Sequence, residues 1–497
     1  MNWRAAAAEA KDADAFTSRP ERSTLSAASA APSPERRPQA KFTTGSLMRH
    51  VVVMTATGSI GLVAVFAVDA LSLFWVSRLG DQALKAAIGY ASQVSFLLMA
   101  VNIGLTIAIS AVVSRALGAG DRIRARRLSA SGTMVTLIAT IVLSALMFAW
   151  RDAMLAGAMH ADGRSAEIAS RVLAIVLPSN VLLGLGMALS GVLRAVGDAR
   201  RAMYVTLSGA VVTAFLDPLL IFGCGLGVYG AAWTIVVARL VVFLTGVEGA
   251  VRAHDLVATP RLKAPRGDLA PLFAIGAPAI LTNLATPVSS VYVTRVWSDF
   301  GEATVAGGAI VDRVVPLAFA VVFALTGSIG PIIGQNYGAK LFDRVERTLT
   351  DSFVVAVGYA FVAWAALAIG AGAIVDAFAA RGASADFVLL CCRVGVFAWV
   401  FMACLFVANT AFNNLGFPVL ATLFNWGRAT LGTIPFITLG ALWGGVPGAV
   451  VGLILGAAIF GLGGVWAAYA VVRRLARRAA PAEPAAPARL ENATKPQ

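Results

Sequence analysis

The sequence is poor in charge, cysteine and histidine, and each shortage excludes a class of protein. Only 13% of the 497 residues are charged, about half the share found in soluble globular proteins, which excludes a soluble domain. The three histidines are far apart and lack metal-ligand spacing, so a metal site is not expected. The four cysteines lie in or beside apolar stretches and predict small buried side chains rather than a disulfide framework: Cys224, Cys391, Cys392 and Cys404.

Motifs for nucleotide binding and for catalysis are also missing. No glycine-rich loop with a lysine follows a strand-like segment, so we do not expect ATP to drive this protein. The short loops opposite the basic ones offer only scattered residues such as His160 and Asp162. The sequence therefore does not predict an enzyme.

Long apolar blocks dominate the chain instead. Hydrophobic residues make up 58% of it, and the mean hydropathy is +0.79. A helix needs about 20 mainly apolar residues to span a bilayer, and the blocks lack the alternation of barrel strands. The chain is expected to be an all-α polytopic membrane protein with twelve transmembrane helices, at about 50–77, 86–114, 128–150, 166–191, 202–223, 228–251, 269–297, 303–333, 347–374, 386–411, 417–441 and 446–472.

Positive charge gathers on alternate loops. The formal net charge is +14, the pI is near 10.3, and few basic residues follow the odd-numbered spans. Because lysine and arginine accumulate in cytoplasmic loops, the bias places both termini on the cytoplasmic side of the cell (inner) membrane. The high pI therefore indicates topology, and no nucleic-acid partner is expected. The basic residues after even-numbered spans are Arg115, Arg122, Arg124, Arg126, Arg127, Arg194, Arg200, Arg201, Arg252, Arg261, Lys263, Arg266, Lys340, Arg344, Arg347, Arg473, Arg474, Arg477 and Arg478.

The chain repeats itself at a nearly constant spacing. Three glycine-containing motifs recur after 220, 219 and 218 residues, pairing Gly118 with Gly338, Gly197 with Gly416, and Gly230 with Gly448. Each repeat holds six spans, an even number, so both halves insert the same way up and form two lobes related by an axis along the membrane normal. The predicted parts are a disordered cytosolic tail (1–47), a first lobe (48–251), a cytosolic linker (252–268), a second lobe (269–472) and a basic, then disordered, cytosolic tail (473–497).

Four motifs in order resemble one family of transporters. "VSRALGAGD", "LRAVGDARRAMYVTLSG", "FLDPLLIFGCGLGVYGAA" and "IIGQNYGAK" are similar to the multidrug and toxic compound extrusion (MATE) family over about residues 48–472. The resemblance implies a secondary active antiporter that exports organic cations or other amphiphilic compounds such as drugs, toxins or metabolites. It implies that the protein lies in a lipid bilayer and works by alternating access. Protons or sodium ions are the exchanged ions, and no other cofactor is expected. We expect a monomer.

A flippase for lipid-linked precursors, built on the same broad superfold, is the alternative. Such a protein is expected to present cationic residues in a central cavity for a pyrophosphate. Arg239, Arg313 and Arg393 lie at membrane depth and keep this alternative open.

The coupling carboxylates are expected in the first lobe. Asp217 lies within the apolar fifth span and precedes Pro218, the predicted hinge. An acid inside a membrane is costly and needs a partner or a purpose. Asp69, in the first span, is expected at a similar depth, so the two acids form a candidate coupled pair. The opposing interpretations are that Asp217 only caps a helix end and that Asp69 is solvated at the outer interface.

Two positions depart from the family pattern. Where many relatives carry an aspartate in the first span, this chain has Ser72, and Asp69 lies one helical turn earlier. Where relatives often have an asparagine in the fifth span, it has Thr213. Ser72 and Thr213 are therefore expected to be neutral hydrogen-bond partners of the two acids.

Further polar residues lie at membrane depth. For Asn102 and Asn180 we expect hydrogen bonds between helices. Arg239 is expected to neutralise Asp217 across neighbouring spans. The remaining candidates are Gln93, as a supporting polar group, and Asp312, as a secondary coupling acid.

Overall fold

The computed structural model describes residues 40–79, 81–158, 163–257 and 266–479. These residues form helices and turns, without a strand. Most of both predicted tails, the middle of the predicted linker, His160 and Asp162 lie outside the described residues.

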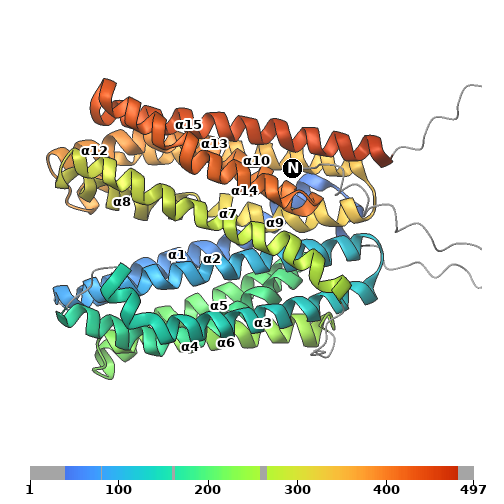
Figure 1. Ribbon diagram of the computed structural model, residues 1–497, viewed down its shortest axis with the longest axis horizontal. Helices are drawn as coiled ribbons and strands as arrows, with labels where there is room; N and C mark the ends of the chain where they lie inside the picture. The colour runs from blue at the N-terminus through green and yellow to red at the C-terminus, as the bar shows by residue number, and fades with distance from the viewer. Residues whose placement is uncertain (1–39, 80, 159–162, 258–265, 480–497) are drawn as a thin grey trace, which may run out of the picture. The chain divides into compact units, whose positions relative to one another are not determined.

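Six helices make up the first lobe, coloured blue to green in Figure 1. Aspartates begin three of them: Asp81, Asp121 and Asp198 each accept a hydrogen bond from a backbone N–H of the following turn, as N-cap residues do. The last four of these helices pack mainly within the lobe, whereas the first two also pack extensively on the second lobe. The six helices are α1 (Leu47–Ser77), α2 (Gln82–Gly118), α3 (Arg122–Ala153), α4 (Gly163–Val196), α5 (Ala199–Pro218) and α6 (Val228–Val247).

The second lobe has the same order of spans but more breaks. α8 and α9 are bent by 44°, and α15 is kinked where Gly444 and Gly445 leave helical geometry. A 3-10 turn, Gly395–Phe397, separates α12 from α13. The helices are α7 (Arg266–Asp299), α8 (Glu302–Ala318), α9 (Ala320–Gly338), α10 (Phe342–Ile369), α11 (Ala371–Ala377), α12 (Ala383–Arg393), α13 (Ala398–Leu415), α14 (Pro418–Gly427) and α15 (Ile434–Ala479).

The twelve predicted spans are confirmed. Within the described residues, ten helical segments are long and apolar enough to cross a membrane. One of them, Pro418–Ala479, has 62 residues, about three times the length that one crossing needs, and the kink at Gly444 and Gly445 divides it into two spans. The bent pair α8–α9 supplies one further span. The ten segments, the extra span from dividing Pro418–Ala479 and the bent pair together give twelve spans.

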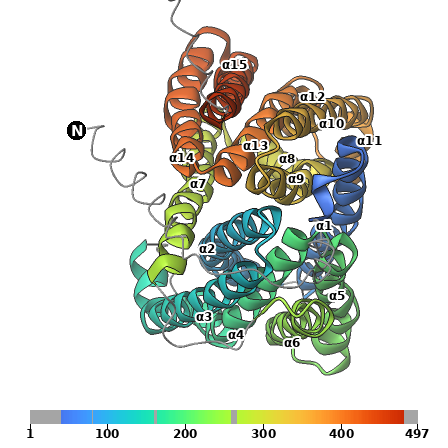
Figure 2. The same ribbon diagram turned by 90° about the vertical axis from the view of Figure 1, so that its right-hand side faces the viewer.

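The segment that precedes α1, residues 40–46, is built into the second lobe. A 3-10 turn, Lys41–Thr43, precedes α1, and Phe42 and Val51 are fully buried in a cluster with Ile329 and Ile332 of α9. Burying a phenylalanine stabilises a fold by about 1.5–3 kcal/mol. Residues 40–46, which the sequence analysis assigned to the tail, are thus part of the folded unit, and α1 runs between α5 and α9 (Figure 2).

One helix of each lobe crosses the other at one end of the molecule. This end bears most of the basic loops, and we call it the basic end. There the ends of α2 and α9 meet backbone to backbone. A Cβ atom on Gly118 would lie 2.0 Å from the carbonyl oxygen of Gln335, and one on Gly338 would lie 2.1 Å from that of Arg115. No side chain fits at these separations, so the glycine pair found by the internal repeat permits the crossing.

Candidate coupling site in the first lobe

The site begins where α5 loses helical geometry. Asp217 is 2% exposed and Pro218 is the last residue of α5. Proline cannot donate a backbone hydrogen bond and clashes with the preceding turn. The chain continues as a π-helical turn, Leu219–Gly223, a wide turn that is frequent at functional sites. The backbone around Asp217 is therefore irregular inside a membrane span.

Asp217 lies beside hydroxyl groups from two other helices. Ser72 in α1 donates a hydrogen bond to its Oδ2 atom, and the Thr234 side chain of α6 lies close to the same carboxyl group. Thr234 is fully buried and donates its hydroxyl proton to Gly230 O at 3.1 Å. The carboxylate thus joins three helices of the first lobe. Sequence reasoning missed Thr234, because a threonine in an apolar span usually bonds only its own helix.

Asp69 lies one turn before Ser72 on α1. It is exposed, and it is close enough to Asp217 for the two carboxyl groups to interact electrostatically. Two negative charges repel strongly where water is scarce, so a bound cation or proton relieves the pair. The carboxyl and hydroxyl oxygens of Asp69, Ser72 and Asp217 are hard ligands, suited to a proton or to a small cation such as sodium.

The other predicted supporting residues lie apart from this pair. Thr213 donates to Gly209 O at 3.0 Å within its own helix. Gln93 is exposed on α2. The predicted partnership of Thr213 with an acid is therefore not seen, and of the two family departures only Ser72 contacts a carboxylate.

Asn102 and Asn180 form a buried interhelical network. Asn102 Nδ2 donates to Asn180 Oδ1 at 3.0 Å, and Asn180 Nδ2 donates to Ser144 Oγ at 3.2 Å. These bonds tie α2, α4 and α3 together. Both asparagines are 1% exposed, so the network holds the lobe that carries the site.

The predicted pair of Arg239 with Asp217 is wrong. Arg239 Nη1 donates to Val176 O at 2.9 Å and to Ser179 Oγ at 3.0 Å. Pro178 lies inside α4 and leaves the backbone there short of one hydrogen bond. The guanidinium of α6 fastens this irregular part of α4 and does not neutralise the acid.

The second lobe presents a different set of charges. Asp312 and Arg313 are exposed on α8, and Arg393 is exposed at the end of α12. Arg428 is 9% exposed, and its Nε and Nη2 atoms are enclosed without a hydrogen-bond partner in the described structure. Sequence reasoning overlooked Arg428, although an arginine near the middle of an apolar span is itself a signal.

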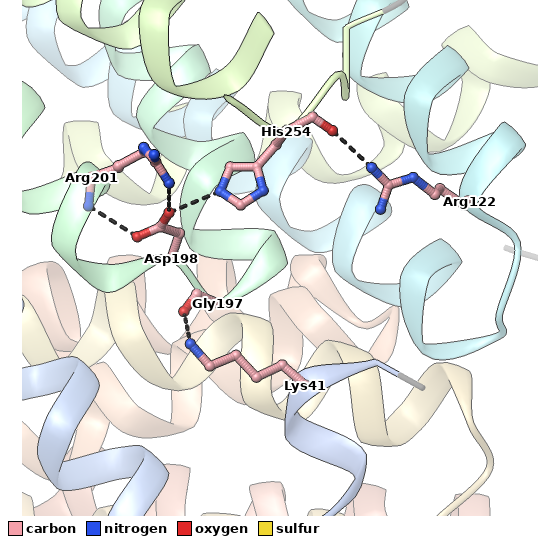
Figure 3. A network of polar contacts seen from close by, with 6 residues as sticks. All are labelled: Lys41, Arg122, Gly197, Asp198, Arg201 and His254. Carbon is pink, nitrogen blue, oxygen red and sulfur yellow. Dashed lines mark hydrogen bonds and ion pairs between the residues drawn. The ribbon is translucent and has the colours of Figure 1, made fainter. Parts of the chain in front are cut away.

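A polar network lies at the basic end, outside the spans. Asp198 accepts hydrogen bonds from Arg201 Nη1 at 2.9 Å and pairs with His254 Nε2 at 2.8 Å, while Arg122 Nη2 donates to His254 O at 2.8 Å (Figure 3). Lys41 Nζ donates to Gly197 O at 2.6 Å. The turn between α4 and α5 is thus held directly by two other parts of the chain, at Lys41 and His254, and Arg122 of α3 in turn holds His254.

The charge state of Asp198 follows from these contacts. Partial burial by itself would raise the pKa of its carboxyl group. Hydrogen bonds from the side chain of His254 and from the backbone and side chain of Arg201 outweigh that effect and lower the pKa to about 2. Asp198 is therefore a stable anion that caps α5 near neutral pH.

Comparison with known proteins agrees with this architecture. The MatE family model matches residues 59–219 and again residues 278–438. The second match begins and ends 219 residues after the first, the spacing of the internal repeat. Together the matches cover more than half of the chain.

Individual relatives have low sequence identity to this chain but match it over long stretches. The chain is 24% identical to an "FAD transporter" of Shewanella oneidensis, over 86% of this chain and 94% of that protein. It is 23% identical to the "Multidrug export protein MepA" of Staphylococcus haemolyticus, over 57% of this chain and 64% of that protein.

Two solved structures share the fold. The VcmN MATE transporter of Vibrio cholerae has a TM-score of 0.80 at 23% identity, covering 87% of this chain and 97% of VcmN. An outward-facing MATE transporter has a TM-score of 0.84 at 20% identity, and the match covers 88% of this chain and 99% of that transporter. From the two family-model matches, one in each lobe, we conclude that this chain belongs to the MatE family.

Proposed function

We propose that this protein is a secondary active antiporter that exports small amphiphilic compounds, in exchange for protons or sodium bound at Asp217 and Asp69. The observation that carries the proposal is the buried Asp217 carboxylate, held by Ser72 and close to a second acid. The family of multidrug export proteins supports it, and a flippase is not favoured. The protein is a multi-pass membrane protein. We further propose that it is a monomer of the inner membrane with both termini in the cytoplasm, as its basic loops indicate.

The geometry supports a simple coupling step. A cation or proton that enters from outside neutralises one carboxyl group of the pair. Repulsion between Asp69 and Asp217 then disappears, and the bond from Ser72 changes partner or strength. Because α1, α5 and α6 all contact Asp217, these helices repack around the irregular backbone at Pro218. In alternating access, such repacking in one lobe changes which side of the membrane the substrate cavity faces.

Dye export from proteoliposomes tests the proposal. The purified native chain and Asp217→Asn are reconstituted in parallel, and efflux of a cationic dye is followed under an imposed pH gradient, an imposed sodium gradient, or neither. We expect the native chain to export dye with one of the gradients. Asp217→Asn, which keeps the shape but not the charge, is expected to lose at least about 90% of that export, the effect of removing a group that must change charge.

The outcomes separate coupling from structure. Melting curves in detergent show whether Asp217→Asn is folded. Gradient-driven export by a folded Asp217→Asn variant at the native rate would contradict a coupling role for Asp217. Asp312→Asn serves as the control, because Asp312 is an exposed acid of the other lobe.

A second candidate concerns the charge of the substrate. An unpaired buried guanidinium is costly unless an anion meets it, and Arg428 has two enclosed nitrogens without partners in the described structure. A relative that matches over nearly its whole length is described as an FAD transporter, and FAD carries phosphates. These observations make amphiphilic compounds with an anionic group a second candidate class of substrate, beside the cationic one.

Competition distinguishes the two substrate classes. If substrates are cationic, organic cations inhibit dye export and flavin nucleotides do not, and Arg428→Gln leaves export unchanged. If substrates carry a phosphate, flavin nucleotides inhibit dye export by the native chain, and they no longer inhibit export by Arg428→Gln.

A further inference from the structure

Each lobe ends its second span with a polar side chain that reaches into the other lobe at the basic end. In α2, Arg115 donates from Nε to Asn414 O at 2.9 Å and from Nη2 to Asn413 O at 2.8 Å. Both acceptors are in the last turn of α13. In α9, Gln335 Nε2 donates to Ala195 O at 2.7 Å, in the last turn of α4. Each side chain therefore satisfies carbonyls at a helix end, which lack partners within their own helix.

These two contacts are counterparts under the internal repeat. Arg115 and Gln335 are 220 residues apart, and Ala195 and Asn414 are 219 apart. These are the spacings that relate Gly118 to Gly338 and Gly197 to Gly416. Two lobes that only happened to touch would not exchange equivalent hydrogen bonds in both directions. The reciprocity indicates that the basic end is a built interface between the lobes.

The segment that precedes α1 stabilises one of the two contacts. Phe42 N donates to Gln335 Oε1 at 2.9 Å, so Gln335 binds the first lobe with one end of its amide and residue 42 with the other. Phe42 O in turn accepts from Asn336 Nδ2 at 3.2 Å and from Arg344 Nη2 at 3.0 Å. The segment 41–45 is therefore held to the second lobe by side chains of α9 and α10.

The same segment also contacts the first lobe. Lys41 Nζ donates to Gly197 O at 2.6 Å (Figure 3). The ring of Phe42 packs so closely on the same turn that a Cβ atom on Gly197 would lie 2.8 Å from its Cζ atom. Gln335 is 1% exposed and Phe42 is fully buried. Residues 41–45 thus contact both lobes next to the hydrogen bond between Gln335 and Ala195.

We propose that Arg115 and Gln335 are a pair of positioning residues that hold the lobes together at the basic end, and that residues 41–45 lock the Gln335 member. This inference rests on the proposed function in one respect: an antiporter that works by alternating access must open its lobes at the basic end. Opening breaks the three side-chain donations to helix ends, and it breaks either the Lys41 contact or the Phe42 contact. The closed state of this end is therefore favoured until both members of the pair release together.

A distance measurement tests the pair directly. Spin labels are placed at Ile123→Cys in the first lobe and Asp343→Cys in the second, both exposed near the crossing, in a background carrying Cys224→Ser to remove the exposed native thiol. Double electron–electron resonance then reports the separation of the lobes at the basic end in detergent, without substrate or gradient. We expect one short distance for the otherwise native chain.

Three variants change the contacts in steps. Gln335→Glu keeps the acceptor for Phe42 N but loses the donor to Ala195 O. Arg115→Ala loses both donations to α13. The double variant loses all three. Because hydrogen bonds of this kind each change an equilibrium by about tenfold, we expect a new longer distance that grows from the single variants to the double variant. Arg124→Ala is the matched control, since it removes an exposed arginine of the same end.

The outcomes also separate this proposal from the proposed function. An unchanged distance in a folded double variant, or an equal change in Arg124→Ala, overturns the pair as a lock. If the distance lengthens as expected while no preparation exports dye, the lock stands and the transport proposal fails. Removal of residues 1–44 is expected to lengthen the distance less than the double variant does. If the truncation has no effect, the locking role of residues 41–45 is overturned.

Discussion

The Ser72 hydroxyl in α1 donates a hydrogen bond to the Asp217 carboxylate in α5, across 145 residues of sequence. Ser72 occupies the position where the family resemblance leads one to expect an acid. The serine therefore contacts the carboxylate that remains, while Asp69 lies one turn away. This arrangement places one buried and one exposed acid in the first lobe.

Replacement of Ser72 tests the value of its hydrogen bond. We expect Ser72→Ala to slow gradient-driven dye export by about tenfold or more, because one hydrogen bond to a charged group is lost. Ser72→Thr keeps the hydroxyl and is expected to retain most of the rate. Equal rates for Ser72→Ala and the native chain, measured in the same proteoliposomes, would show that Asp217 does not need this partner.

Asp69 is predicted to share the coupling role with Asp217. We expect Asp69→Asn to weaken the dependence of export on the imposed gradient, because the repulsion that favours ion binding is lost. Asp312→Asn, the exposed acid of the second lobe, is expected to behave as the native chain does. The measurement is the ratio of export rates with and without the gradient. A greater loss in Asp312→Asn than in Asp69→Asn would move the coupling site to the second lobe.

Arg239 is predicted to stabilise α4 rather than to balance Asp217. Arg239→Gln leaves Val176 O and Ser179 with weaker partners, so we expect a loss of about 1–3 kcal/mol, seen as a lower melting temperature in detergent. Because the two sites share no contact, the shifts caused by Arg239→Gln and Asp217→Asn are expected to add in the double variant. A double variant that is more stable than the sum predicts would reveal an ion pair.

Asp198 is predicted to stabilise the basic end in a pH-dependent way. Its pKa of about 2 lies below the ordinary value of about 3.9, so its stabilising effect is complete above about pH 4 and disappears as the pH falls through 2. Asp198→Ala removes both charge and N-cap and is expected to cost about 1 kcal/mol or more at pH 7. Asp198→Asn keeps a good cap and is expected to cost less.

Melting temperatures of the three proteins at pH 7 and pH 3 check this order. The difference between the native chain and Asp198→Asn is expected to shrink at pH 3. A difference that is constant with pH would mean that the charge of Asp198 contributes nothing and that only its capping geometry matters.

The sequence by itself determined the number of spans, their approximate ends and the two-lobe repeat. It did so because the bilayer enforces a simple rule, that about 20 apolar residues in succession must form a helix. The same rule makes an acid such as Asp217 conspicuous among apolar neighbours. The glycine pairs were visible for a related reason, since only glycine permits backbones to touch, as at Gly118 and Gly338.

Only the tertiary structure decided which polar groups meet. Arg239 and Asp217 are both intramembrane charges and looked like a pair, yet Arg239 of α6 donates its hydrogen bonds to α4, close to Pro178. Ser72 rather than Thr213 bonds Asp217, because the rotation of each helix about its own axis is set by packing against neighbours and not by its apolar length. Hydropathy fixes how deep a residue lies in the membrane; the faces that helices turn to one another decide its partner.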